Sequence, residues 1–175
     1  METSDRIALV GELHATRTAF LEALAGVSEA QAKFKLAPDR WSIEECAEHV
    51  VLVEKGMLKR VTDESAVSAR NERPGRQEEI RGSTLNRANK RESPAHVVPS
   101  GRFGSLAKAL EQFSVNRDQT IGYVSDCNDD LDARSIVHPI GPMTCHECLI
   151  VIANHPLRHL GQIREIQETP GYPMA

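Results

Sequence analysis

Apolar residues along the chain recur mainly at three- and four-residue steps, the spacing that gathers side chains on one face of an α-helix. No segment keeps the two-residue alternation of a strand, so the pattern predicts an all-α protein. Four long segments follow the helical spacing, at residues 4–25, 42–61, 103–124 and 144–168. The apolar faces of the first three include Leu9, Leu13, Phe20, Ile43, Val50, Leu58, Leu106, Leu110 and Phe113.

Three helix starts are marked by a hydroxyl residue that precedes a Glu or Gln by three positions. In this arrangement the hydroxyl accepts from the later backbone N–H, while the longer side chain accepts from the earlier one. The pairs predict a short helix after Ser28 and the beginnings of the second and fourth long helices. They are Ser28 with Gln31, Ser42 with Glu45, and Thr144 with Glu147.

The connection between the second and third long helices is unusually long. Residues 62–103 are polar and charged, are interrupted by prolines and glycines, and contain one short helical segment near RQEEIRGSTLNRANK. A link of about forty residues lets the helices at its two ends run parallel, whereas short loops join antiparallel neighbours. We therefore expect a four-helix bundle with a long crossover between helices 2 and 3, in a single domain that spans residues 1–175.

Composition narrows the classes of function. The chain has 175 residues, with 21 Lys and Arg against 25 Asp and Glu, and its net charge of −4 argues against nucleic acid as a partner. No apolar stretch approaches the length of about 18 residues that spans a membrane, and no signal peptide is recognisable. Four cysteines are too few for a disulfide scaffold, so a reduced, cytoplasmic location is expected.

The histidines provide the strongest indication of chemistry. His155 and His159 differ by about 40° around a helix axis and about 6 Å along it, so both imidazoles can approach one point. Taken alone, this spacing is more common among solvated or packed histidines than among metal ligands. His49 lies in the second helix at a matching height if that helix is antiparallel to the fourth. The three residues together predict a metal site.

Several other reactive side chains have simpler explanations. Cys145 and Cys148 form a C-x-x-C at a helix N-terminus, where the helix dipole lowers a thiol pKa, but no βαβ context accompanies them. Packing is therefore preferred over redox chemistry for this pair. Cys46 precedes His49 by three residues and is interpreted as a core residue. Among the remaining histidines, His138 is interpreted as a turn residue, and His14, His96 and His146 have no converging partner.

Four further residues are candidates for supporting roles around the histidines. Glu45 and Glu48 are candidate hydrogen-bond acceptors or general bases, yet Glu45 has a capping role and Glu48 is assigned to a different helix face from His49. Arg158 is a candidate for steering an anionic substrate, with a surface salt bridge as the favoured alternative. Trp41 is expected to pack at the end of the bundle.

The chain also resembles the DinB-like superfamily, in its branch of metal-dependent hydrolases. The resemblance is carried by WSIEECAEHVVLVE at 41–54, by FGSLAKALEQFSVNRDQTIGYV with the DDL that follows, and by HPIGPMTCHECLIVIANHPLRHLGQIREI at 138–166. It implies an up-down-down-up four-helix bundle with a divalent metal, commonly zinc or nickel, bound by three histidines. Carried over to this sequence, those ligands are His49, His155 and His159. The resemblance also implies a homodimer. The superfamily includes thiol transferases, among them a maleylpyruvate isomerase.

Three neutral histidines leave a coordination position open on Zn²⁺, as in catalytic sites. That position accepts a water or a thiol whose pKa the metal lowers. The leading hypothesis is therefore a metal-dependent enzyme that performs hydrolysis or thiol S-transfer on a small-molecule substrate, with a low-molecular-weight thiol as one candidate. The alternative is a non-catalytic metal-binding stress-response or ligand-binding module on the same bundle.

One residue departs from the family pattern within the proposed site. Pro156 directly follows His155 and lacks the amide that would bond to the carbonyl of Ile152. The sequence predicts that the last helix kinks or splits here, with Asn154 as a local cap. Such a change would alter the direction of His155.

Overall fold

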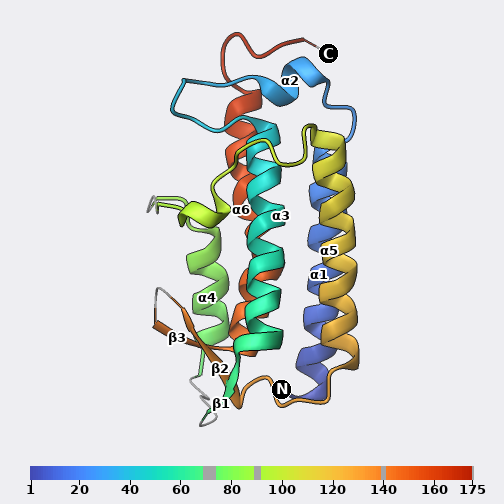
Figure 1. Cartoon of the computed structure of the whole chain (residues 1–175), viewed down its shortest axis with the longest axis vertical. Coiled ribbons are helices and arrows are strands. Elements are labelled where there is room, and N and C mark those ends of the chain that lie inside the picture. The colour runs from blue at the N-terminus through green and yellow to red at the C-terminus, as the bar shows by residue number, and fades with distance from the viewer. Residues whose placement is uncertain (69–73, 89–91, 139–140, 175) are drawn as a thin grey trace.

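The computed structural model describes residues 1–68, 74–88, 92–138 and 141–174, and the protein is mostly helical (Figure 1). This helical character was predicted, and each predicted long segment overlaps one long helix. The long helices are α1 (Thr3–Leu24), α3 (Ile43–Lys59), α5 (Leu106–Asp126) and α6 (Cys145–Gln167). The shorter elements are α2 (Glu29–Lys33), the π-helical turn η1 (Arg60–Glu64), α4 (Arg76–Leu85) and the 3₁₀ turn η2 (Ala95–Val97).

The long helices lie side by side, and α1 and α3 each contact both α5 and α6. Figure 1 shows α1 and α6 running in one direction and α3 and α5 in the other. The middle of α3 therefore faces the middle of α6 in antiparallel orientation. The link between α3 and α5 contains α4, which packs on α6. No helix in the described ranges is both long enough and apolar enough to cross a bilayer.

All three predicted capping boxes are present. At the start of α3 the Ser42 hydroxyl accepts from the Glu45 N–H at 3.2 Å, and the Glu45 carboxylate accepts from the Ser42 N–H at 2.8 Å. These reciprocal bonds satisfy two amides that the first helical turn would otherwise leave without partners. They fix where α3 begins and hence the height of His49 in the fold.

Ser42→Ala should lower the free energy of unfolding by about 1 kcal/mol, because it removes the acceptor for the Glu45 amide. Urea denaturation followed by circular dichroism measures this loss. Ser114→Ala is the control, since Ser114 lies inside α5 and its hydroxyl donates to the Leu110 carbonyl one turn earlier. That change should stay within about 0.5 kcal/mol of the unsubstituted protein. Equal effects of the two substitutions would contradict the capping role.

The all-α prediction was wrong in one region, where β1 (Ala66–Val67), β2 (Arg134–His138) and β3 (Gly141–Thr144) form a small antiparallel sheet in that order. Ile136 of β2 pairs with Met143 of β3, and both are buried, whereas Val137 is exposed. The alternation of buried and exposed residues in β2 is therefore too short to be recognised from the sequence. The prolines and glycine of HPIGP favoured a turn instead, and residues 139 and 140 of this motif lie outside the described residues.

The buried apolar residues form two clusters, one toward each end of the long helices. The cluster nearer the sheet includes Leu9, Leu13, Met57, Val124, Leu149 and Ile152. The cluster nearer α2 includes Phe20, Val50, Phe113, Leu160 and Ile163. In each long helix the two sets occupy different parts of the sequence, so a boundary crosses the core near its middle.

A buried polar layer occupies this boundary. Arg117 donates from Nε and Nη2 to the two carboxylate oxygens of Glu54 at 2.8 and 3.0 Å. Its Nη1 donates to the Leu13 carbonyl at 2.9 Å and to the Thr16 hydroxyl at 2.8 Å. The Arg117 side chain is 0% exposed and that of Glu54 is 2% exposed. Arg117 of α5 is thus joined to α3 by a buried ion pair and to α1 by hydrogen bonds.

Candidate metal centre

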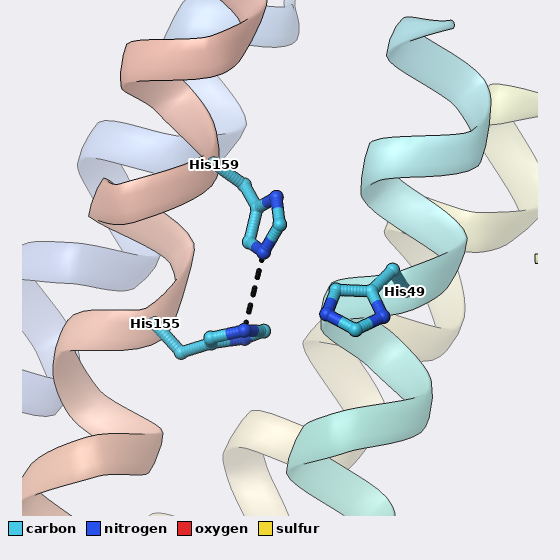
Figure 2. A group of neighbouring side chains, drawn as sticks. All are labelled: His49, His155 and His159. Carbon is cyan, nitrogen blue, oxygen red and sulfur yellow. Dashed lines mark hydrogen bonds between the residues drawn. The ribbon is translucent and has the colours of Figure 1, made fainter. Parts of the chain in front are cut away.

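Three imidazoles converge between α3 and α6 (Figure 2). His49 comes from α3, while His155 and His159 project from successive turns of α6. One ligand atom from each residue lies within 4.8 Å of the other two. The fold therefore brings together the three histidines that the sequence singled out. In the described part of the chain, no other set of three His, Cys, Asp or Glu side chains converges in this way.

The distances between these nitrogens suit a shared cation. The Nε2 atoms of His155 and His159 are 3.1 Å apart. Two imidazole nitrogens bound to tetrahedral Zn²⁺ would be about 3.3–3.4 Å apart, given Zn–N bonds of about 2.0–2.1 Å. The pairs that include His49 need to close by at most about 1.5 Å to reach the same separation. The three nitrogens thus lie near the spacing of a shared cation, so the donor set fits a divalent metal.

The second ring nitrogen of two of the histidines has its own partner. His49 Nδ1 lies 2.8 Å from the carbonyl oxygen of Val97, and His159 Nδ1 lies 3.2 Å from Oε1 of Gln162. Because a carbonyl oxygen can only accept, Nδ1 of His49 carries the proton and Nε2 keeps its lone pair. His155 differs, since its buried Nδ1 has no hydrogen-bond partner among the described residues.

Burial keeps these imidazoles neutral. It lowers the pKa of His49 and, to about 3, the pKa of His159. It also lowers the pKa of His155 well below the usual value, and the neighbouring imidazoles of His49 and His159 add to that effect. The positive charge of Arg158 lowers all three pKa values further. At neutral pH each ring is therefore neutral, the form that binds metal.

Pro156 does not split α6, which runs without a break from Cys145 to Gln167. The predicted cap at Asn154 is also absent, because its side-chain amide donates to Glu12 and to the Ile150 carbonyl. The Ile152 carbonyl, which loses its helical partner at Pro156, instead accepts from Nη2 of Arg117 at 3.3 Å. This contact replaces the missing bond, and His155 still faces the other two histidines.

Trp41 belongs to the histidine cluster and not only to the end of the helices. Its ring centroid lies 4.7 Å from that of His49 and 6.2 Å from that of His159, with the latter pair stacked. Aromatic packing of this kind restricts the rotation of both imidazoles. The position of Trp41 before Ser42 suggested only a packing residue, because the local sequence does not reveal which side chains the indole contacts.

Three of the cysteines are buried and are not activated. Cys46, Cys145 and Cys148 are buried free thiols. Burial raises the pKa of Cys145 and raises those of Cys46 and Cys148 to about 12. The expected lowering by the helix N-terminus is therefore outweighed by desolvation. This supports the packing interpretation of the C-x-x-C pair.

Arginines occupy the border between α4 and α6 beside the histidines. Arg158 donates to the carbonyls of Thr84 and Asn86 at the end of α4, and Arg87 donates to the Arg158 carbonyl at 3.0 Å and to Glu165 at 2.6 Å. Arg158 is therefore engaged with backbone at the edge of the site. Together with Arg87 it gives the surroundings of the histidines a positive electrostatic character.

Comparison with known proteins agrees with this picture. A sequence model of the family described as the DinB superfamily matches residues 12–163, a range that includes all three histidines. The chain is also similar to the Uncharacterized protein YuaE of Bacillus subtilis (strain 168), with 27% identity over 149 residues that cover 83% of this chain and 88% of that protein. No solved structure gives a significant match.

Proposed function

The chain belongs to the DinB superfamily, and we propose that it is a metal-dependent enzyme in which His49, His155 and His159 bind a divalent cation, zinc or nickel. The observation that supports this most directly is the convergence of three neutral imidazoles whose ligand atoms lie within 4.8 Å of one another. In the wider proposal the long helices form an up-down-down-up four-helix bundle in one domain of residues 1–175, and the protein is a cytoplasmic homodimer.

The composition of the cluster supports catalysis over a structural role for the metal. Structural zinc sites use four protein ligands, whereas catalytic sites use three and keep one position open. No carboxylate or thiol joins the three histidines among the residues that the structure describes. When bound, the cation would supply Lewis-acid chemistry by lowering the pKa of a water or a thiol in the open position.

The substrate we propose is a small molecule with an anionic or thiol group, modified by hydrolysis or thiol S-transfer. Arg158 and Arg87 supply positive charge beside the imidazoles, and no acidic residue is among the groups that perturb the pKa values of those rings. A thiolate or another anion would therefore be attracted to the site. In this proposal the neutral histidine rings bind the cation, and the arginines orient the incoming group electrostatically.

A non-catalytic metal-binding or ligand-binding module is the second candidate. It is favoured by the burial of the ligands, because His49 and His159 are each only 5% exposed. A substrate needs a path to the cation, whereas a stabilising metal does not. The two candidates differ in whether an added molecule can reach the metal.

Protein purified without chelator should contain about one divalent metal per chain by elemental analysis. After chelation, adding Zn²⁺ or Ni²⁺ at about 100 times the dissociation constant should stabilise the fold by about 2.7 kcal/mol. For a domain of this size, that corresponds to a rise in Tm of about 5–10 °C. Absence of bound metal together with an unchanged Tm would refute the metal site.

Cobalt substitution separates the enzyme from the binding module. In the enzyme, titration of the Co²⁺-loaded protein with a small thiol should produce a sulfur-to-cobalt charge-transfer band, because the thiolate enters the open position. A visible spectrum that stays unchanged at saturating thiol and over a range of pH would instead support the non-catalytic module.

A further inference from the structure

Glu48, the residue next to His49, binds the backbone of the segment that leads into α5. Its carboxylate accepts from the N–H groups of Ser100 at 2.9 Å, Gly101 at 2.8 Å and Arg102 at 3.3 Å. The Glu48 residue is 2% exposed, so these contacts are almost completely shielded from water. A buried carboxylate that accepts three backbone bonds is a strong anchor, because each bond is charge-assisted.

The shape of the segment depends on Gly101, whose φ of +78° lies in the left-handed region. This conformation turns successive N–H groups toward one point and creates a concave binding site for an anion. The Arg102 guanidinium donates back to the His96 carbonyl at 3.0 Å, which closes the segment on itself. The anion that occupies this concavity is the Glu48 side chain.

The same segment provides the carbonyl that contacts a candidate ligand. Val97 precedes the Glu48-bound amides by three residues, is 5% exposed, and its carbonyl oxygen lies 2.8 Å from Nδ1 of His49. Two consecutive side chains of α3 therefore bind one short stretch of chain at two points. Moving the segment away from Glu48 would also move the Val97 carbonyl away from His49.

We propose that Glu48 is a positioning residue, which holds the Val97 carbonyl against His49 and so fixes the tautomer that leaves Nε2 free for the metal. The consequence for metal binding rests on the proposed function. The link from Glu48 through residues 97–102 to the His49 ring is independent of any metal. Gln162 has the corresponding role for His159 by direct contact.

The decisive measurement is the tautomer of His49 in metal-free protein, read from the ¹⁵N shifts of its ring nitrogens. In the unsubstituted protein Nδ1 should carry the proton. In Glu48→Ala the His49 resonances should move toward a mixture of the two tautomers, because the Val97 carbonyl is no longer held in place. Glu48→Gln, which retains one acceptor oxygen, should give a smaller change and serves if the alanine variant fails to fold.

Glu147→Gln is the matched control. Glu147 is also a buried carboxylate that accepts a backbone N–H, from Thr144 at 2.9 Å, but it lies at the start of α6, far from the site. It should lower stability without changing the His49 tautomer. A folded Glu48 variant with an unaltered tautomer would overturn the proposal, and so would an equal tautomer change in Glu147→Gln.

Metal affinity provides a second readout. The loss of a partner that orients a ligating histidine typically weakens metal binding by about 10–100-fold, and we expect this for Glu48→Ala but not for Glu147→Gln. Unchanged affinity in a variant with a changed tautomer would overturn the link from Glu48 to metal binding. If the unsubstituted protein binds no metal at all, the proposed function fails, while the tautomer experiment still decides the structural role of Glu48.

Discussion

Replacing Arg117 by methionine is expected to lower the free energy of unfolding by about 3–5 kcal/mol, the usual cost of breaking a buried ion pair by removing one partner. The loss arises because the Glu54 carboxylate, in a residue that is 2% exposed, would be left buried without its charged partner. The Ile152 carbonyl beside Pro156 and the Leu13 carbonyl would also lose their guanidinium donor. Guanidinium chloride denaturation of the metal-free protein measures the loss.

Two companion variants make this result specific. Arg17→Met removes a cation from the same side of the fold, but its pair with Asp118 is exposed, so its effect should stay within about 1 kcal/mol. Replacing Glu54 by leucine together with Arg117→Met should recover much of the stability, because no unpaired charge is left. A loss below about 1 kcal/mol in Arg117→Met would mean that water reaches Glu54 and that the layer is not sealed.

His49→Ala is expected to abolish stoichiometric metal binding, with an increase in the dissociation constant of well over 100-fold, because α3 then contributes no ligand. The remaining pair, His155 and His159, belongs to one helix and offers only two nitrogens. Elemental analysis after purification without chelator should give a metal content close to zero. The rise in Tm on adding Zn²⁺ should disappear with it.

His14→Ala controls for the general loss of an imidazole. His14 is exposed on α1 and belongs to no cluster of possible ligands within the described ranges. The variant should retain full metal content and the full thermal response. Retention of metal by His49→Ala would instead place the site on other residues and would remove the basis for catalysis between α3 and α6.

Local sequence signals predicted the helices and their starts well. The pairs Ser42 with Glu45 and Thr144 with Glu147 are short-range patterns, because both capping hydrogen bonds form within four consecutive residues. The pairing of β2 with β3 was missed because Ile136 and Met143 are only two inward positions in strands of four or five residues. Burial of such a short strand depends on its neighbours in the fold, which the local sequence does not specify.

The candidate ligands were found from sequence because histidines four residues apart share a helix face, and His49 lies at a matching height on a helix predicted to be antiparallel. The family resemblance pointed to the same three residues. The residues that support them were not found. Arg117 and Glu54 are indistinguishable from surface charges in a helical pattern until four helices are packed around them. The anchoring role of Glu48 was not foreseen, because its partners are backbone amides more than fifty residues away along the chain.

The polar layer of Arg117 and Glu54 also determines the register in which the helices can pack. Apolar faces alone tolerate sliding, but a slip of one helical turn moves side chains by about 5.4 Å along the axis. Such a slip would place a guanidinium or a carboxylate among the leucines and phenylalanines of the flanking clusters. Since the three imidazoles come from two different helices, a slip far smaller than one turn would already separate them. The ion pair thus protects the alignment of a site that it does not touch.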